Sequence, residues 1–237
     1  SPSVRAAASG ENVTGDLLEM QGIPLDADAA AAQTERIPVY GADNSTATAY
    51  AEDRYASHAG YDTLSDEQKQ LYNAMKQAAH TFYVGSADAE SVSYSTGTMV
   101  CCVAVDTGSQ SLNKEDVVRV ISMCRNDNPV YFFLGSSFLY STDYDFWTGK
   151  SYIDMVYLSC AENCTDGTER QAERKVLENQ IVTVETKVKA GETALEKARI
   201  AHDWLVDTIT YAYDANGDPD NSMTSHSITG VFDAQYH

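Results

Sequence analysis

The sequence is poor in basic residues and contains no long apolar run. Its 237 residues include 16 lysines and arginines against 35 aspartates and glutamates, which gives a net charge of −19. A surface of this sign repels nucleic acid and anionic membranes, so we expect no nucleic-acid partner. Because no stretch of roughly 18 apolar residues is present, we expect no membrane span either.

Motifs of several catalytic and metal-binding classes are also missing. The sequence has no glycine-rich phosphate loop, no G-x-S-x-G turn and no H-E-x-x-H helix. The acidic loop over 214–220 approaches a calcium-binding pattern, but Pro219 and Ser225 stand where an EF-hand loop requires glycine and glutamate. We therefore expect no cofactor and no metal site.

Cysteine is scarce, and its number is odd. The five are Cys101, Cys102, Cys124, Cys160 and Cys164, so at least one thiol is free or pairs outside the chain. The absence of a C-x-x-C pair and of neighbouring histidines argues against zinc. Cys160 and Cys164 could close a small disulfide loop in an oxidising compartment, with idle thiols as the alternative. We expect Cys164 to be better exposed than Cys101, Cys102 and Cys124.

The first sixty residues differ in composition from the rest. Residues 1–60 are rich in alanine, serine, threonine and aspartate and show little apolar periodicity. This composition predicts a poorly ordered N-terminal arm or linker, pinned to the folded part by short pieces such as 37–40. A spacer toward a surface anchor is the functional alternative for this segment.

Residues 61–164 show the patterns of a small α/β subdomain. A capping box at Ser65 predicts a helix over about 65–83, and a cap at Asn113 predicts a second helix that ends before Pro129. Apolar, β-branched or aromatic runs predict strands. These strands are expected over 99–105, 130–134, 138–140 and 152–158, whereas 85–98 is expected to be turn-rich.

Two further helices are predicted after residue 164. The first is capped at Thr168 and ends near Gly191, for which we expect a positive φ. The second begins at a capping box of Thr193 and Glu196. Its apolar stripe comprises Leu195, Ala198, His202, Leu205 and Ile209, with Ala201 and Trp204 beside it. Helices and strands in this order indicate an α+β fold.

Residues 191–237 resemble the opening of a transglutaminase-like domain, part of the papain-like group of enzymes with a cysteine nucleophile. The matching segments are KARIAHDWLV over 197–206, TYAYD over 210–214 and HSITGVF over 226–232, and the turn DNPVYFF over 127–133 adds to the likeness. The resemblance implies that 165–237 is the start of the papain-like core, and that the small α/β layer precedes it.

The resemblance also implies a function. In the family the nucleophilic cysteine opens the next helix, which would lie after His237, and a histidine and an aspartate follow it. The expected parent is a secreted or surface bacterial protein that hydrolyses or transfers amides of a peptide or protein substrate, with cell-wall or surface components as further partners. The 237-residue chain alone is expected to be inactive. His226 is the site-lining candidate, although hydrogen bonding to the backbone of its own turn is the favoured role.

A second interpretation remains open: a non-catalytic binding or adhesion module at the cell surface. None of the cysteines present is a good nucleophile, because burial in apolar surroundings raises the pKa of a thiol. Cys101 and Cys102 belong to a predicted buried strand, and Cys124 belongs to the apolar face of a helix. His202 lies on an apolar stripe, so we expect it to be half-buried rather than catalytic.

Overall fold

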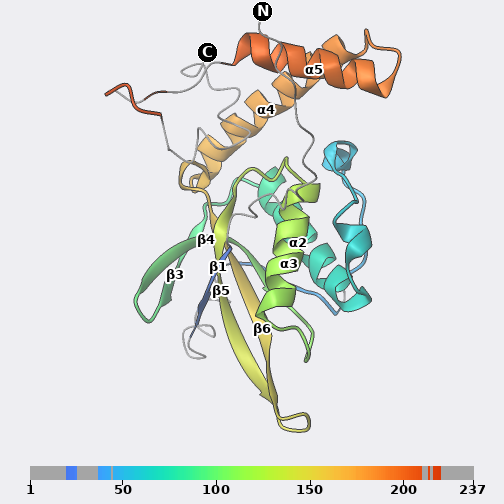
Figure 1. The fold of residues 1–237 in the computed structure, drawn as a ribbon. Helices are drawn as coiled ribbons and strands as arrows, with labels where there is room; N and C mark the ends of the chain where they lie inside the picture. Colours follow the sequence, from blue (N-terminus) through green and yellow to red (C-terminus); the bar gives the residue numbers. More distant parts are fainter. Residues whose placement is uncertain (1–19, 26–36, 44, 210–212, 214–215, 220–237) are drawn as a thin grey trace, which may run out of the picture.

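The computed structural model describes residues 20–25, 37–43, 45–209, 213 and 216–219. It is a mixed sheet with helices, so the predicted combination of helices and strands is confirmed (Figure 1). The strands are β1 (Gln21–Pro24), β2 (Val39–Gly41), β3 (Glu90–Tyr94), β4 (Gly97–Asp106), β5 (Leu134–Asp145) and β6 (Lys150–Cys160). The helices are α2 (Asp66–Val84), α3 (Lys114–Asp127), α4 (Gly167–Val188) and α5 (Ala194–Thr208). Short 3-10 helices are η1 (Ala51–Tyr55), η2 (Tyr61–Thr63) and η3 (Glu162–Cys164).

The sheet is built around three long antiparallel strands. Its order is β1-β5-β6-β4-β2, and β3 pairs with β4 as well. β5 with β6, β6 with β4, and β3 with β4 are antiparallel, whereas β1 lies parallel to β5 and β2 lies parallel to β4. β2 and β3 therefore share the edge of β4 that faces away from β6.

The two outer parallel strands come from the segment predicted to be an arm. Gln21 pairs with Ser137 at the start of β1, and Val39 pairs with Ala104 at the start of β2. The pinning of the arm near 37–40 is confirmed, but the prediction of poor order is wrong for 21–24. Strands this short carry too little periodicity to be recognised, since neighbouring strands supply most of their stabilisation.

The main core lies between the sheet and the helices α2 and α3 (Figure 1). Both predicted caps form: Gln68 N donates to Ser65 Oγ, and Asp116 N donates to Asn113 Oδ1. Fully burying a side chain such as Leu71 contributes about 1.5 to 3 kcal/mol. A smaller apolar cluster, which includes Leu139 and Tyr157, lies on the other face of the sheet.

Two predictions within the α/β part are wrong. Residues 90–94, expected to be turn-rich, form β3. Residues 130–133, expected to be a strand, form successive turns, in which Tyr131 N donates to Asn128 O and Leu134 N donates to Tyr131 O. Tyr131 and Phe133 are buried in the core from this turn. The run is apolar because it fills the core, and strands and buried turns share that composition.

The caps of the third helix also differ from the prediction. α4 is capped by Asp166, whose Oδ1 accepts from the amides of Thr168 and Glu169, and not by Thr168 itself. Among the described residues, positive φ occurs at Gly108, Gly149 and Gly217, so Gly191 is not a left-handed cap. The capping box of Thr193 and Glu196 at the start of α5 is confirmed.

The first turns of α4 are bound to the end of α2. Arg170 donates to the carbonyls of Gly85 and Ala87, and Gln171 donates to those of Tyr83 and Gly85. The last carbonyls of a helix lack partners within the helix, so these side chains satisfy them. From this attachment α4 rises away from the sheet, and α5 folds back across its far end (Figure 1). The domain boundaries predicted near residues 60 and 164 stay predictions, although contacts cross both.

Candidate functional site

The predicted apolar stripe of α5 lies in solvent. None of the residues in Ala194–Thr208 is buried. Leu195 is 81 % exposed, Leu205 39 % and Val206 65 %. Ala201 and Trp204 are half-buried. An amphipathic helix ordinarily covers its apolar face, so this surface is suited to contact a further structural element.

The environment of His202 follows from this exposure. Its side chain is 73 % exposed, and Nδ1 lies 3.3 Å from Oδ1 of the neighbouring Asp203. The prediction of a half-buried histidine is wrong, because the stripe on which it lies is uncovered. Asp203 also pairs with Arg199, whose Nε lies 3.5 Å from Asp203 Oδ2.

His226 lies outside the described residues, so its site-lining role stays a prediction. Of the matching segment over 210–214, only Tyr213 is described, and it forms an isolated bridge with Pro219. Within the described part of the chain, no group of three or more histidine, cysteine or acidic side chains could hold a metal ion. None of the described helices combines the length and the apolar character needed to cross a bilayer.

All five cysteines are buried and carry free thiols. The predicted burial of Cys101 and Cys124 is confirmed, and burial raises the pKa of each to about 12. Burial also raises the pKa of Cys102 well above its ordinary value, with a hydrogen bond to Cys160 as the next cause. Burial therefore disfavours the reactive thiolate form of Cys101, Cys102 and Cys124.

Cys164 is not better exposed than Cys101, Cys102 and Cys124. It is 1 % exposed, and burial, followed by the effect of Cys160, raises its pKa to about 12. It lies in η3 beneath the start of α4, where Arg170 Nη1 donates to its carbonyl oxygen at 3.0 Å. The expected exposure is wrong because a buried guanidinium closes this turn. The disulfide between Cys160 and Cys164 stays a prediction.

The native chain is expected to resist thiol reagents. At pH 8 a thiol of pKa 12 is ionised in only about one molecule in ten thousand, and reagents attack the thiolate. A chromogenic disulfide reagent should react slowly with the folded chain and should count five thiols in denaturant. Burial raises the pKa of Cys101, Cys124 and Cys164 in the folded state, so thiol ionisation favours the unfolded chain. The folded chain is therefore expected to lose stability as pH rises above the unfolded thiol value of about 8.5. Rapid labelling of one thiol per chain in the native state would contradict the expected resistance to thiol reagents.

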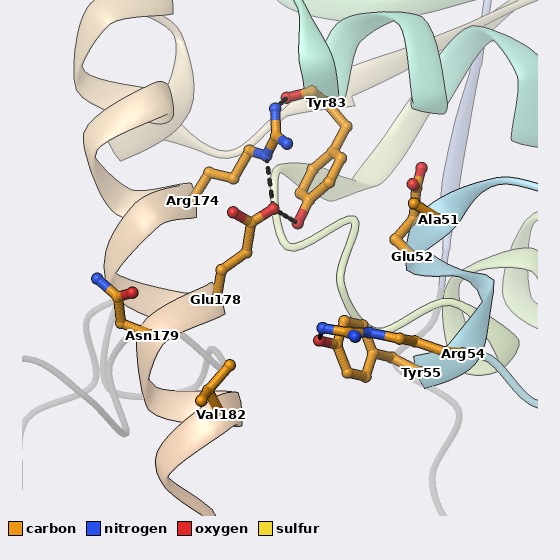
Figure 2. A pocket seen from close by; sticks show the side chains of 9 residues that line it. All are labelled: Ala51, Glu52, Arg54, Tyr55, Tyr83, Arg174, Glu178, Asn179 and Val182. Atoms are coloured by element: carbon orange, nitrogen blue, oxygen red, sulfur yellow. Dashed lines mark hydrogen bonds and ion pairs between the residues drawn. The ribbon is translucent and has the colours of Figure 1, made fainter. Parts of the chain in front are cut away.

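A pocket of about 440 Å³ lies between η1 and α4, beside the end of α2 (Figure 2). Its lining comprises Ala51, Glu52, Arg54, Tyr55, Tyr83, Arg174, Glu178, Asn179 and Val182. These residues come from the segment predicted to be an arm and from two helices, so no sequence motif announces the pocket. The one available signal was the i, i+4 spacing of Arg174 and Glu178.

The α4 side of the pocket is held by a small network. Glu178 Oε1 accepts from Arg174 Nε at 2.9 Å and from the Tyr83 hydroxyl at 3.1 Å (Figure 2). The Arg174 guanidinium also lies 4.4 Å from the centre of the Tyr83 ring. Burial, followed by the charge of Glu178, raises the pKa of Tyr83 to about 12, so its hydroxyl remains a donor at neutral pH.

The η1 side of the pocket carries one buried and one exposed charge. Glu52 is 7 % exposed, lies 2.5 Å from His80 Nδ1 and accepts from the Tyr131 hydroxyl at 3.2 Å. Arg54 is exposed, and its guanidinium lies 4.4 Å from the centre of the Tyr55 ring. Among the described residues, no carboxylate lies within ion-pair distance of Arg54.

Comparisons with protein-family models, with curated proteins and with solved structures found no match to this chain.

Proposed function

We propose that α5 belongs to the opening of a transglutaminase-like domain. The protein to which this chain belongs then hydrolyses or transfers amides through a cysteine nucleophile that is not one of the five present here. The observation that supports this proposal most is the exposure of the apolar stripe of α5, in the segment that carries the KARIAHDWLV resemblance. A core helix of an enzyme domain would have such a face and would bury it against its neighbours.

The chemistry expected of such a site sets its requirements. A thiolate at the start of a helix is stabilised by the helix dipole and by an adjacent imidazole, and a carboxylate orients that imidazole. Cys101, Cys124 and Cys164 do not meet these requirements, since each is buried with a raised pKa. The substrate we propose is a peptide or protein amide at the cell surface or outside the cell.

The activity of two preparations tests this proposal. The 237-residue chain is expected to show no amide hydrolysis or transfer on peptide substrates. The whole natural protein is expected to show activity that iodoacetamide abolishes. Activity of the 237-residue chain that iodoacetamide inhibits would contradict the proposal, as would activity of the whole protein that the reagent leaves unchanged.

One observation favours the alternative, a binding or adhesion module. Phe146 and Trp147, at the tip of the β5–β6 hairpin, are 86 % and 98 % exposed. The tip is ordered by Asp145, whose carboxylate accepts from Trp147 N at 2.8 Å and from Thr148 Oγ1 at 2.6 Å. Ordered, exposed aromatic side chains are typical of binding surfaces.

Changing both aromatic residues at the tip to serine tests the alternative. A binding module that uses this tip should lose at least about tenfold in affinity for insoluble cell-wall material, because each aromatic side chain contributes on the order of 1 kcal/mol or more. Co-sedimentation of the purified variant with that material measures the effect. Tyr152→Phe, in β6 of the same hairpin, is the control, since its ring remains. Equal sedimentation of all three proteins would exclude this use of the tip.

A further inference from the structure

The pocket between η1 and α4 has two walls that carry opposite charges available to a ligand. Arg54 belongs to the η1 wall and Glu178 to the α4 wall, with Tyr83 between them (Figure 2). Counted over the lining residues, the two guanidiniums of Arg54 and Arg174 balance the two carboxylates of Glu52 and Glu178. A ligand whose own charges sum to zero leaves this balance unchanged.

Arg54, on the η1 wall of the pocket, is placed to bind a carboxylate. Arg54 lies along the Tyr55 ring and contacts the Tyr55 hydroxyl, which limits the directions its guanidinium can take. No acidic side chain in the described part of the chain neutralises it, although the protein carries 35 such residues. A guanidinium offers five donors in a planar fork that matches the two oxygens of a carboxylate.

Glu178, on the α4 wall of the pocket, is placed to bind an amino group. Arg174 and Tyr83 both bind Oε1 of Glu178, which fixes the orientation of the carboxylate. Its second oxygen, Oε2, accepts no hydrogen bond from any described residue. An ammonium group has donors only and would form a charge-assisted hydrogen bond to such an oxygen.

The size and the remaining lining of the pocket select the ligand class. A volume of about 440 Å³ falls within the range of small-molecule sites. Tyr55, Tyr83 and Val182 present apolar surface, and Asn179 adds a side-chain amide. This combination suits a molecule with a short carbon and amide framework between two charged ends.

We propose that this pocket binds a short peptide with free ends, its terminal carboxylate on Arg54 and its amino group on Glu178. The inference does not rest on the proposed amide chemistry, because its residues belong to η1, α2 and α4 and include no nucleophile. Binding here and catalysis elsewhere can therefore succeed or fail separately.

The probe is trialanine in three forms: unmodified, acetylated at its amino end, and amidated at its carboxyl end. Titration of the nitrogen-15-labelled chain, followed by NMR, should give saturable shifts centred on the amides of Tyr83, Asn179 and Val182. Acetylation and amidation should each weaken binding about tenfold, since each removes one charge-assisted hydrogen bond.

Two variants assign each end of the peptide to its wall. Arg54→Gln should lower the affinity for unmodified trialanine about tenfold, and this variant should bind the amidated and unmodified forms equally. Glu178→Gln should also lower the affinity for unmodified trialanine about tenfold, and this variant should bind the acetylated and unmodified forms equally. Arg199→Gln removes the same charge from an exposed position on α5 and should bind as the unaltered chain does.

Three results would overturn the inference. These are equal affinity of the unaltered chain for all three forms, unchanged affinity in both pocket variants, and the absence of saturable shifts at millimolar peptide. The comparison of the three forms uses the unaltered chain, so it holds even if a variant folds poorly.

Discussion

Replacing Arg170 with alanine is expected to destabilise the chain by about 3 to 5 kcal/mol. Arg170 is fully buried, and its guanidinium lies 3.5 Å from the centre of the Phe82 ring. It donates to the carbonyls of Cys164 at 3.0 Å, Gly85 at 3.3 Å and Ala87 at 2.6 Å. Alanine would leave a cavity at the junction of α2, η3 and α4, together with carbonyls that have lost their donor.

Denaturation by urea measures this loss, and two other variants separate its causes. Arg170→Lys keeps the charge but cannot span three carbonyls with a planar fork, so an intermediate loss is expected. Arg174→Ala, one turn further along α4, removes a partly exposed ion pair with Glu178 and should cost no more than about 1 kcal/mol. A loss at Arg170 no larger than that at Arg174 would show that the buried guanidinium does not hold the junction.

Replacing Asp127 with alanine is expected to cost about 3 kcal/mol at neutral pH, because several buried donors lose their acceptor together. Asp127 is 2 % exposed and accepts from Ser57 Oγ at 2.5 Å, from Gly60 N at 3.0 Å and from Tyr61 N at 2.8 Å. The Tyr72 hydroxyl also donates to it, at 3.2 Å. One carboxylate at the end of α3 thus binds the chain that leads into α2.

The same carboxylate gives the prediction a pH dependence. Burial acts to raise the pKa of Asp127, but the hydrogen bonds from Ser57, Gly60, Tyr61 and Tyr72 outweigh burial, and the pKa is lowered. A lowered pKa contributes stability above the unfolded value of about 3.9, and this is lost as pH falls through the folded value. The difference between the unaltered chain and Asp127→Ala should therefore shrink below about pH 4.

Thermal melts from pH 2 to pH 7 measure this difference. Asp62→Ala is the matched control, since Asp62 is an exposed carboxylate in η2, in the segment that Asp127 anchors. It should change stability little at any pH. A constant difference across the pH range would mean that alanine at 127 acts through lost packing rather than through the lost charge.

The elements that could be predicted from the sequence are those with strong local signals. The caps at Ser65, Asn113 and Thr193 act within one turn of the helix that they begin, so each start was predicted to within a residue. The strands of the central hairpin are long enough for their apolar character to show. β1 and β2 have four and three residues, and their partners lie far away in the sequence, so local patterns do not reveal them. β3 pairs with the adjacent β4, but its five residues, ESVSY, contain no apolar run.

Local patterns likewise predict some features of the candidate site and not others. The burial of Cys101, Cys102 and Cys124 followed from apolar runs, whereas the burial of Cys164 depends on an arginine that a local pattern assigns to a solvated helix face. The pocket was missed because Arg54 and Glu178 come to line the same pocket only through the attachment of α4 to α2. The apolar stripe of α5 was predicted as a face that needs partners, but such a pattern does not say what covers it.

The central claim is that α5 belongs to an enzyme domain whose nucleophile is a cysteine other than these five. The most direct test is to label the active whole protein with one equivalent of iodoacetamide and to locate the modified residue by peptide mass spectrometry. We predict loss of activity together with modification of a cysteine outside these 237 residues, and unmodified thiols at the five cysteines within them. Inactivation that coincides with modification of Cys101, Cys102, Cys124, Cys160 or Cys164 would contradict the claim.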